Sequence, residues 1–362
     1  MTFDLRLLRD GGISWLDASG PESAVVLSTR VRLARNLRGY PFTIRTSQED
    51  RQSILGQVLE SCEQSTLLTE ATTFLLSELD LADRQLLHER HLVSKELAGL
   101  ESGKNVRSSA AALTDGHLGV LVNEEDHVRL QVLRSGFSLA EAYADLERLD
   151  AELGDHLSFA FHPEFGYLTS CPTNAGTGLR ASVLIHLPGL VLTKEIAKVL
   201  QGLSQVGLTF RGLYGEGSEV VGNFFQLSNQ TTLGKSEDEL LDHLAKIVSQ
   251  VVQYERQARE VLQRDAAGVI ADKVWRAYGL LRYARSLSFD ETMNLLSGVR
   301  LGVGLNLVPN LSVYTLNKLL IFTQSAHLAD AEGRPLPDTD LSVSRASYVR
   351  EQLAADEARA SS

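Results

Sequence analysis

The segment at residues 167–190, YLTSCPTNAGTGLRASVLIHLPGL, contains side chains and backbone positions suited to chemistry. Cys171 supplies a thiol, and Gly176 and Gly178 let the backbone approach a ligand with no Cβ in the way. Arg180 follows, and its planar guanidinium can bind an anion through several donors. The segment is a poor P-loop, because no Lys-Ser/Thr pair follows the glycines at the required spacing. Taken alone, such a segment is more typical of a glycine turn that joins two core elements.

Two arginines alternate with apolar residues further upstream. Residues 25–33, VVLSTRVRL, are rich in β-branched and apolar side chains and predict a strand. Alternation places Arg30 and Arg32 on one face of that strand, where they repel each other unless an anion or carboxylates neutralise them. The alternative is a solvated strand face. Arg35 and Arg38 are interpreted as surface charges.

A cluster of acids lies within residues 119–132, GVLVNEEDHVRLQV, which predict two strands joined by a turn. Glu124, Glu125 and Asp126 are consecutive, and Arg129 follows on the second strand. The alternative interpretation is a simple acidic hairpin, but the repulsion among three adjacent carboxylates would destabilise such a turn. One carboxylate directed inward could orient a cationic substrate while Arg129 faces an anion.

Residues 208–222, LTFRGLYGEGSEVVG, predict a strand that runs into a glycine-rich loop. Arg211 precedes the loop, and Glu216 and Glu219 lie on it. Such a loop fits a lid that closes over a substrate, with a flexible surface hairpin as the alternative. His91, in ERHLVS, is a further candidate, although a single histidine is more often structural.

Apolar periodicity predicts the elements that position these groups. Helices are expected within residues 47–100, 137–153, 193–203 and 236–262, and a strand at 224–233. Thr193 is predicted to be an N-cap, and Ser236 to form a capping box with Glu239. After about residue 265 the pattern is helical, which predicts a second, helical domain.

Composition limits the class of protein. The 362 residues suffice for about two domains, and 43% hydrophobic and 22% charged residues are typical of a globular protein. A net charge of -11 argues against a general nucleic-acid binder and suits attraction of basic protein segments. We expect no membrane span and no signal peptide, because no apolar run approaches about 20 residues and charges interrupt the N-terminus. Two distant cysteines predict no disulfide framework, and a reducing cytoplasm is expected.

The charged groups together describe a pair of ligands. Arginines at positions 30, 32, 129, 180 and 211 point to a polyphosphate, and the carboxylates near them point to a cation that must meet it. ATP and a guanidinium satisfy this description, although a carboxylate-binding enzyme would also use arginines. The segments STRVRLARN, NEEDHVR and CPTNAGTGLRASV resemble, in this order, three motifs of the phosphagen (guanidino) kinases. RGLYGEGSE resembles their flexible substrate loop, and nearly the whole chain is similar to the bacterial protein-arginine kinases within this family.

The resemblance implies an α+β fold. It places a guanidino-kinase-type antiparallel sheet flanked by helices in residues 1–255, and an all-helical domain for dimerisation, regulation and substrate contact in residues 256–362. It implies ATP and Mg²⁺ as cofactors, with no metal ligands from protein side chains. The ATP-binding residues that it implies are Ser28, Thr29, Arg30, Val31, Arg32, His91, Arg129, Arg180, Ala181, Ser182, Val183, Leu184, Arg211, Gly212, Leu213, Tyr214, Gly215 and Glu216.

The implied catalytic groups are Glu125, Glu216, Glu219 and Cys171. Glu125 and Glu216 would hold the substrate guanidinium. Glu219 occupies the position of the second glutamate in small-guanidine kinases, so either loop acid could act. Cys171 would lie beside the guanidinium as a thiolate that assists the reaction and does not attack. Carboxylates can align a guanidinium and accept a proton as the N–P bond forms.

Three departures from the family pattern bear on substrate and regulation. Small-guanidine kinases have a helical domain before their first arginine motif, whereas that motif begins here at Ser28, which favours arginine on a protein surface as the substrate. Tyr214 stands where those kinases usually have a phosphate-binding arginine, and Arg211 could compensate. The Arg-Asp-x-x-Arg-Ala motif that binds phosphoarginine in protein-arginine kinases is reduced to LSVSRA at residues 341–346. Arg345 remains but the leading Arg-Asp pair is missing, so we expect weakened or lost phosphoarginine feedback.

We therefore expect an ATP-dependent kinase that phosphorylates exposed arginine side chains of proteins. In the family, such marks direct damaged proteins to a Clp-type protease and can inactivate a repressor of stress genes, and the resemblance also implies a homodimer. The alternatives are a small-guanidine phosphagen kinase, such as an arginine kinase, and a catalytically inactive adaptor that binds phosphoarginine.

Overall fold

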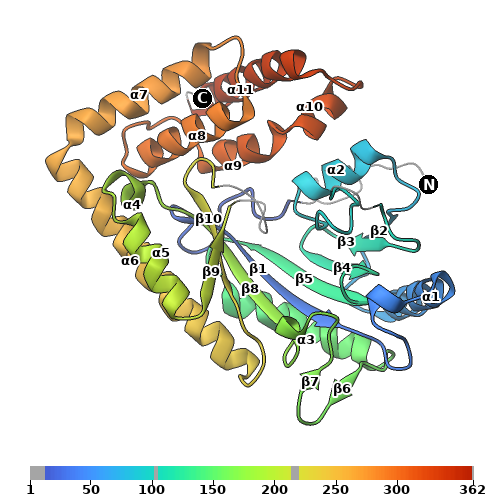
Figure 1. Cartoon of the computed structure of the whole chain (residues 1–362). Coiled ribbons are helices and arrows are strands. Elements are labelled where there is room, and N and C mark those ends of the chain that lie inside the picture. Colours follow the sequence, from blue (N-terminus) through green and yellow to red (C-terminus); the bar gives the residue numbers. More distant parts are fainter. Residues whose placement is uncertain (1–12, 102–104, 213–219, 361–362) are drawn as a thin grey trace.

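The computed structural model describes residues 13–101, 105–212 and 220–360. Its centre is an eight-stranded antiparallel sheet in the order β2-β3-β4-β5-β1-β8-β10-β9 (Figure 1). The strands are β1 (Val26–Arg35), β2 (Thr72–Leu75), β3 (Ala111–Thr114), β4 (Leu118–Val122), β5 (Val128–Ser135), β8 (Leu179–His186), β9 (Leu208–Arg211) and β10 (Phe224–Asn229). A small separate sheet consists of β6 (Phe161–His162) and β7 (Gly166–Tyr167). The expected α+β fold with an antiparallel sheet is confirmed.

The alternation predicted for β1 is present. Val31 and Leu33 are buried in the main hydrophobic core, which also contains apolar side chains of α3 (Leu139–Gly154). Arg30 and Arg32 project from the opposite face of the strand, where they line a cavity. The pleat of a single strand therefore separates the core from the candidate site.

The helices around the sheet are α1 (Gln48–Gln64), α2 (Leu81–Glu89), α3, α4 (Pro188–Leu192), α5 (Ile196–Gln205) and α6 (Glu237–Asp265). Ser236 and Glu239 form the predicted capping box, with both reciprocal hydrogen bonds present. Thr193 is not an N-cap. It follows the last residue of α4, and its hydroxyl donates to the Gly189 carbonyl at 2.9 Å, while α5 begins only at Ile196.

The helical prediction for residues 47–100 is also partly wrong. The β-branched and aromatic segment Thr72–Leu75 forms β2, which pairs with β3 at the edge of the sheet. After α2 ends at Glu89, residues 90–100 form turns. Local apolar spacing did not reveal this strand, because its stability comes from pairing with a segment about 40 residues away.

The C-terminal region consists of α7 (Ala267–Tyr283), α8 (Phe289–Gly304), α9 (Val313–Phe322), α10 (Ser325–Ala331) and α11 (Asp338–Ala360). These helices enclose a second hydrophobic core, to which the sheet contributes Leu27, Leu133, Leu184 and Phe224. The region therefore packs against the sheet, next to α2 on one side and α6 on the other (Figure 1). The boundary after residue 255 stays a prediction, and α6 runs across it as one helix. No helix within the described ranges is long and apolar enough to cross a membrane.

Candidate active site

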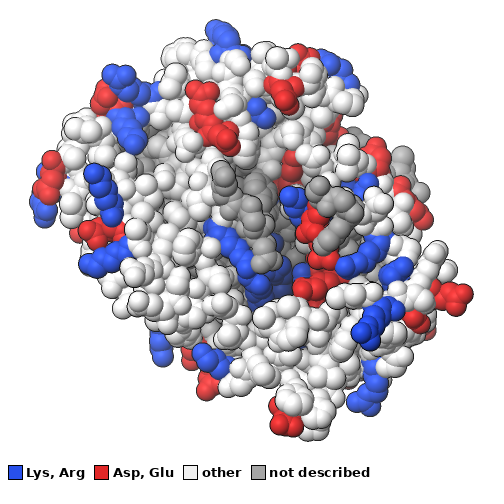
Figure 2. Space-filling model, viewed as in Figure 1, with Lys and Arg blue, Asp and Glu red and all other residues white. Residues whose placement is uncertain are grey.

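Arginines from three adjacent strands line the cavity on the open face of the sheet. Arg30 and Arg32 come from β1, Arg129 from β5 and Arg180 from β8. Arg32 is directly opposite Arg180 in the antiparallel register, so their side chains emerge side by side. Figure 2 shows this positive charge gathered in a central hollow of the molecule, beside a group of acidic side chains.

The guanidinium groups of Arg30 and Arg32 form no hydrogen bond or ion pair with any residue that the structure describes. Burial, followed by the nearby charges of Arg180 and Arg129, lowers the pKa of Arg30 to about 10. Burial, then the nearby charges of Arg30, Arg129 and Arg180, lowers the pKa of Arg32. With a pKa of about 10, Arg30 remains cationic at neutral pH, and like charges buried this close together are unfavourable without a compensating anion.

The three consecutive acids have three different environments. Glu124 is 1% exposed and forms an ion pair with Arg129. Glu125 accepts hydrogen bonds from Arg129 Nη2 at 2.8 Å and from Asn174 Nδ2 at 3.4 Å, and its side chain is 36% exposed. Asp126 faces away from the cavity, where its Oδ1 accepts from Asn36 Nδ2 and from the Ser170 amide, both at 2.7 Å.

Arg129 therefore links the positive and negative halves of the cavity. Burial opposes its charge, but Glu124 and Glu125 raise its pKa overall. Because Glu125 is the more exposed of the two acids, it is the carboxylate best placed to meet a cationic substrate. Glu124 is buried and its main contact is with the arginine.

The glycine turn packs backbone against backbone. Both glycines have positive φ, and a Cβ on Gly178 would lie 2.6 Å from the Ala34 carbonyl oxygen. A Cβ on Gly176 would lie 2.7 Å from the Thr232 carbonyl oxygen. Gly178 also lines the cavity, but the requirement for glycine comes from these close contacts within the chain. The structure thus gives both glycines a packing role, and the approach of a ligand to their backbone stays a prediction.

Cys171 lies just before a short 3₁₀ turn, Pro172–Asn174, which brings the Asn174 side chain to the cavity. The Cys171 sulfur is 3.0 Å from Thr173 Oγ1. Cys171 is partly exposed and lies three residues from Asn174, the contact of Glu125. Cys171 itself is not among the residues that line the cavity.

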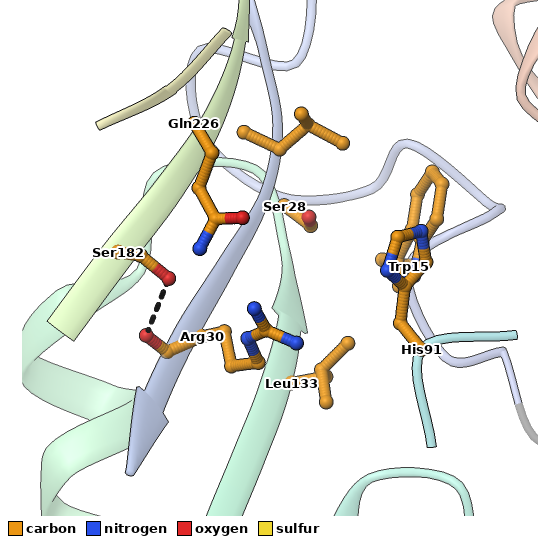
Figure 3. A pocket seen from close by; sticks show the side chains of 8 residues that line it. Trp15, Ser28, Arg30, His91, Leu133, Ser182 and Gln226 are labelled. Atoms are coloured by element: carbon orange, nitrogen blue, oxygen red, sulfur yellow. Dashed lines mark hydrogen bonds between the residues drawn. The ribbon is translucent and has the colours of Figure 1, made fainter. Parts of the chain in front are cut away.

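A second, smaller pocket continues from the same cavity. Figure 3 shows it between β1, β8 and β10 on one side and Trp15 and His91 on the other. Arg30, His91 and Gln226 line both spaces, so the two are continuous. The remaining lining residues of the small pocket are Trp15, Ser28, Leu133, Ser182 and Leu184. Burial, then Arg30 and His88, lower the pKa of His91 to about 3, so its ring is neutral.

Three of these lining residues were missed by the sequence interpretation: Trp15, Leu133 and Gln226. Gln226 had a signal, since it is a polar residue in the apolar strand FFQLSN and stands opposite Leu184 in the register. Trp15 had none, because it lies in an irregular segment before the first strand. Its indole nitrogen is buried and has no hydrogen-bond partner within the described ranges.

Other predicted residues are placed differently. Val31, Ala181 and Val183 direct their side chains into the core on the opposite face of the sheet. Thr29 also faces away, donating to the Gly136 carbonyl at 2.6 Å and accepting from the Ser138 amide at 3.1 Å. Arg211 lines the cavity, and Gly212 follows β9 directly. Leu213, Tyr214, Gly215, Glu216 and Glu219 lie outside the described residues.

Two arginines are held within the protein itself. Arg35 was expected at the surface, but its side chain is 2% exposed and pairs with Asp150 at 2.7 Å, so that prediction was wrong. Arg345, in α11, is buried and donates to the carbonyls of Thr323 at 2.7 Å and Leu287 at 2.9 Å. Its donors thus hold together segments of the helical region. Among the described residues no group of three or more His, Cys, Asp or Glu side chains could hold a metal ion.

Comparison with protein families gives two matches. Residues 53–258 match the family described as ATP:guanido phosphotransferase, C-terminal catalytic domain. Residues 267–362 match the family described as Protein-arginine kinase McsB C-terminal domain. The two matches account for most of the chain.

Individual proteins agree with these families. The protein-arginine kinases of Desulforamulus reducens and Symbiobacterium thermophilum are each 44% identical to this chain, over 94% of its length and over 95% and 96% of theirs. Among solved structures, the duplicated taurocyamine kinase of Schistosoma mansoni with bound transition-state-analogue components has a TM-score of 0.59 at 27% identity, covering 70% of this chain and 35% of that one. A lombricine kinase, at 22% identity and a TM-score of 0.56 over 67% of this chain and 71% of its own, shares the fold.

Proposed function

The chain belongs to the protein-arginine kinase family of ATP:guanido phosphotransferases, and from that premise we propose that it transfers the γ-phosphoryl group of ATP to arginine side chains of proteins. One observation carries the proposal. Arg30 and Arg32, without partners among the described residues, face the same cavity as the carboxylate of Glu125. A polyphosphate and a guanidinium are complementary to these two halves.

We assign the phosphates of ATP to Arg30, Arg32 and Arg180, with Arg211 and Arg129 at the edges of the same cavity. The base and ribose would occupy the smaller pocket, between Gln226 on β10 and the rings of Trp15 and His91 (Figure 3). Bound Mg²⁺ would neutralise charge on the phosphates, with water as its other ligand. The carboxylates of Glu124 and Glu125 are engaged by Arg129, which fits a metal held by phosphates.

The chemistry follows from the acidic side of the cavity. Glu125 would align the substrate guanidinium and localise its charge on the nitrogens away from the γ-phosphorus. The attacking nitrogen forms the N–P bond while the bond from that phosphorus to the β–γ bridging oxygen breaks, and the nitrogen's proton passes to the carboxylate. The arginines stabilise the charge that develops on the transferred group and on departing ADP.

The remaining catalytic assignments rest on the family motifs. We propose that Glu216 or Glu219, in the loop after β9, supplies the second carboxylate. Cys171 would act as a thiolate beside the guanidinium, a role supported by its place three residues before Asn174, which donates to Glu125. The implied contacts of Ser28 and Ser182 are supported by their place in the wall of the small pocket.

The direct test uses ATP-Mg²⁺ with either free arginine or an unfolded basic protein. Acid-labile phosphate on the protein and none on free arginine is the expected result. Labelling of free arginine alone would favour a small-guanidine phosphagen kinase, and labelling of neither would favour an inactive phosphoarginine-binding adaptor. Glu125→Gln should abolish labelling but leave ATP affinity nearly intact, because Arg129 keeps its ion pair with Glu124. Preserved activity would remove Glu125 from the mechanism.

Regulation and cellular role are further proposals. Phosphoarginine feedback should be weakened, a view supported by the loss of the Arg-Asp pair at residues 341–342 and by the engagement of Arg345 with backbone carbonyls. Titrating free phosphoarginine against kinase activity tests it, and strong stimulation would refute it. Marking of proteins for a Clp-type protease, a part in the stress response and a cytoplasmic location rest on family resemblance. A homodimer through the helical region is supported by four exposed apolar side chains on α7, Val269, Trp275, Leu280 and Tyr283.

A further inference from the structure

A buried carboxylate joins the helical region to the wall of the nucleotide cavity. Glu89 is the last residue of α2, a helix that lies beside α10 (Figure 1). It accepts hydrogen bonds from the Ala326 amide at 3.1 Å, the His327 amide at 3.3 Å and His327 Nδ1 at 2.8 Å. Few carboxylates in a protein are both buried and this fully engaged, and the contact spans more than 230 residues of sequence.

The next residue completes the junction. Arg90 Nε donates to His327 Nε2 at 3.0 Å, so the imidazole is held at both nitrogens, donating to Glu89 and accepting from Arg90. The guanidinium of Arg90 also lies over the ring of Phe322, at the end of α9. Burial lowers the pKa of His327, in agreement with the neutral ring that this hydrogen-bond pattern requires.

The two residues that flank this pair line the cavity. His88 precedes Glu89 and His91 follows Arg90, and both belong to the cavity wall. His91 has a left-handed backbone conformation, with φ of 62°, which a non-glycine residue keeps only when its neighbours hold it there. On the other side Gln131 Nε2, from β5, donates to the Leu92 carbonyl at 2.8 Å. His91 is thus positioned between an anchor on the sheet and an anchor on α10.

We propose that Glu89 is a positioning residue for nucleotide binding, which holds the His88–His91 wall in place through His327 of the helical region. The inference rests on the proposed nucleotide site. On this basis, α10 contributes to ATP affinity without touching ATP. A purely structural role would instead affect stability alone.

The chain offers a matched control. Glu255, in α6, is also fully buried and accepts from two backbone amides at a helix start, Gly189 and Leu190, both at 2.9 Å. It also pairs with an arginine, Arg259, at 2.7 Å. It is absent from the lining of both pockets. Neither carboxylate lines a pocket, but Glu89 adjoins His88 of the cavity wall, whereas no sequence neighbour of Glu255 lines either pocket. Glu255→Gln and Glu89→Gln therefore make the same chemical change, and only the second makes it beside the wall.

The experiment measures ADP affinity by calorimetry and the steady-state constants for ATP. Glu89→Gln should raise the Kd for ADP and the KM for ATP about tenfold, with kcat within about twofold, through the loss of charge-assisted hydrogen bonds. Glu255→Gln should lower the melting temperature but leave the Kd unchanged. His327→Ala should behave as Glu89→Gln, whereas His327→Asn, which keeps a donor near the Nδ1 position, should recover most of the affinity.

The outcomes separate this inference from the proposed function. Wild-type affinity for ADP in Glu89→Gln, or an equal loss in Glu255→Gln, would overturn the positioning role alone. If His327→Asn bound ADP as weakly as His327→Ala, the hydrogen bond to Glu89 would not be the cause. Failure of the wild-type protein itself to bind ADP would overturn the proposed function and the inference with it.

Discussion

The two faces of β1 use arginine in opposite ways. Arg35 lies on the core side, where it forms two hydrogen bonds with Asp150, at 3.0 and 2.7 Å, and donates to the carbonyls of Ala34 and Thr177. Its guanidinium also stacks on the Tyr167 ring, 3.4 Å from the centroid. Arg32, on the cavity side, has a buried Nε without any hydrogen-bond partner in the described part of the chain. Two arginines of one strand therefore differ, because Arg35 ties segments of the fold together and Arg32 has a buried donor for which the described residues supply no acceptor.

This difference shows which property distinguishes a binding arginine. Burial does not, since Arg35 is the more buried of the two. A carboxylate partner does not either, because the hydrogen bonds that Arg345 makes to described residues go to the carbonyl oxygens of Thr323 and Leu287. The distinguishing property is whether the protein itself supplies acceptors for the guanidinium donors. A buried donor left without an acceptor costs stability, and a ligand that supplies the acceptor would remove that cost.

The largest expected effect comes from removing a cavity arginine. Arg30→Met should slow phosphorylation of a protein substrate by about a thousandfold, because the transferred phosphoryl group loses a fixed positive charge. Without nucleotide, the melting temperature should stay equal or rise, since burial and the other arginines already disfavour the charge of Arg30. Rate assays and thermal unfolding of the same preparation provide the measurement. A fall of several degrees would assign Arg30 to the fold instead.

The reverse result is expected on the other face of the strand. Arg35→Met should lower the free energy of unfolding by about 3–5 kcal/mol, because Asp150 and two carbonyls lose their buried partner. Activity per folded molecule should change little. Urea denaturation gives the stability, and Arg35→Lys, which keeps the charge but not the planar fork, should fall in between. A stable but inactive Arg35→Met protein would contradict the division between the two faces.

The sequence predicted the cavity side of β1 better than the core side. Strand alternation identified Arg30 and Arg32 because their apolar neighbours mark the opposite face. It could not identify Arg35 as buried, because its acceptors come from α3 and from the glycine turn, more than 110 residues away. The sequence likewise predicted only part of the acidic cluster at residues 124–126. Its position was predictable, but which acid meets Arg129 and which binds Asn36 is decided by the packing of distant segments.

The same limit explains the residues that were missed. Helix capping at Ser236 depends on neighbours three residues away and was predicted correctly. Trp15 and Gln226 line the same small pocket because an irregular N-terminal segment lies against β5 and because β10 joins the sheet next to β8. The residue spacing within either segment does not predict that these two side chains line one pocket. The resemblance to family motifs named many of the residues that line the cavity, because such motifs carry tertiary information indirectly.

Replacement of His91, in the cavity wall, should have a smaller effect than the two arginine substitutions, and it should change how stability depends on pH. The folded-state pKa of His91 is about 3, below the 6.5 of a free histidine, so the unfolded chain binds a proton first as pH falls. Stability from the neutral ring is therefore present above about pH 6.5 and is lost progressively below it. In His91→Gln the decline in unfolding free energy between pH 7 and pH 5 should be smaller by about 2 kcal/mol. Urea denaturation at both pH values measures it, and an unchanged decline would show that His91 protonates in the folded protein.

The smallest effect is expected where arginine donors face water. Arg276, on α7, is 77% exposed and pairs with Asp272 at 2.8 Å within the same helix. Arg276→Ala should change the free energy of unfolding by less than about 0.5 kcal/mol, because solvent already satisfies both charges. Urea denaturation at two protein concentrations checks this. A larger loss that depended on concentration would mean that a second copy covers α7, beside the exposed Trp275 and Leu280. Arg276 would then belong with Arg35 as an arginine whose acceptors come from protein, supplied in this case by another chain.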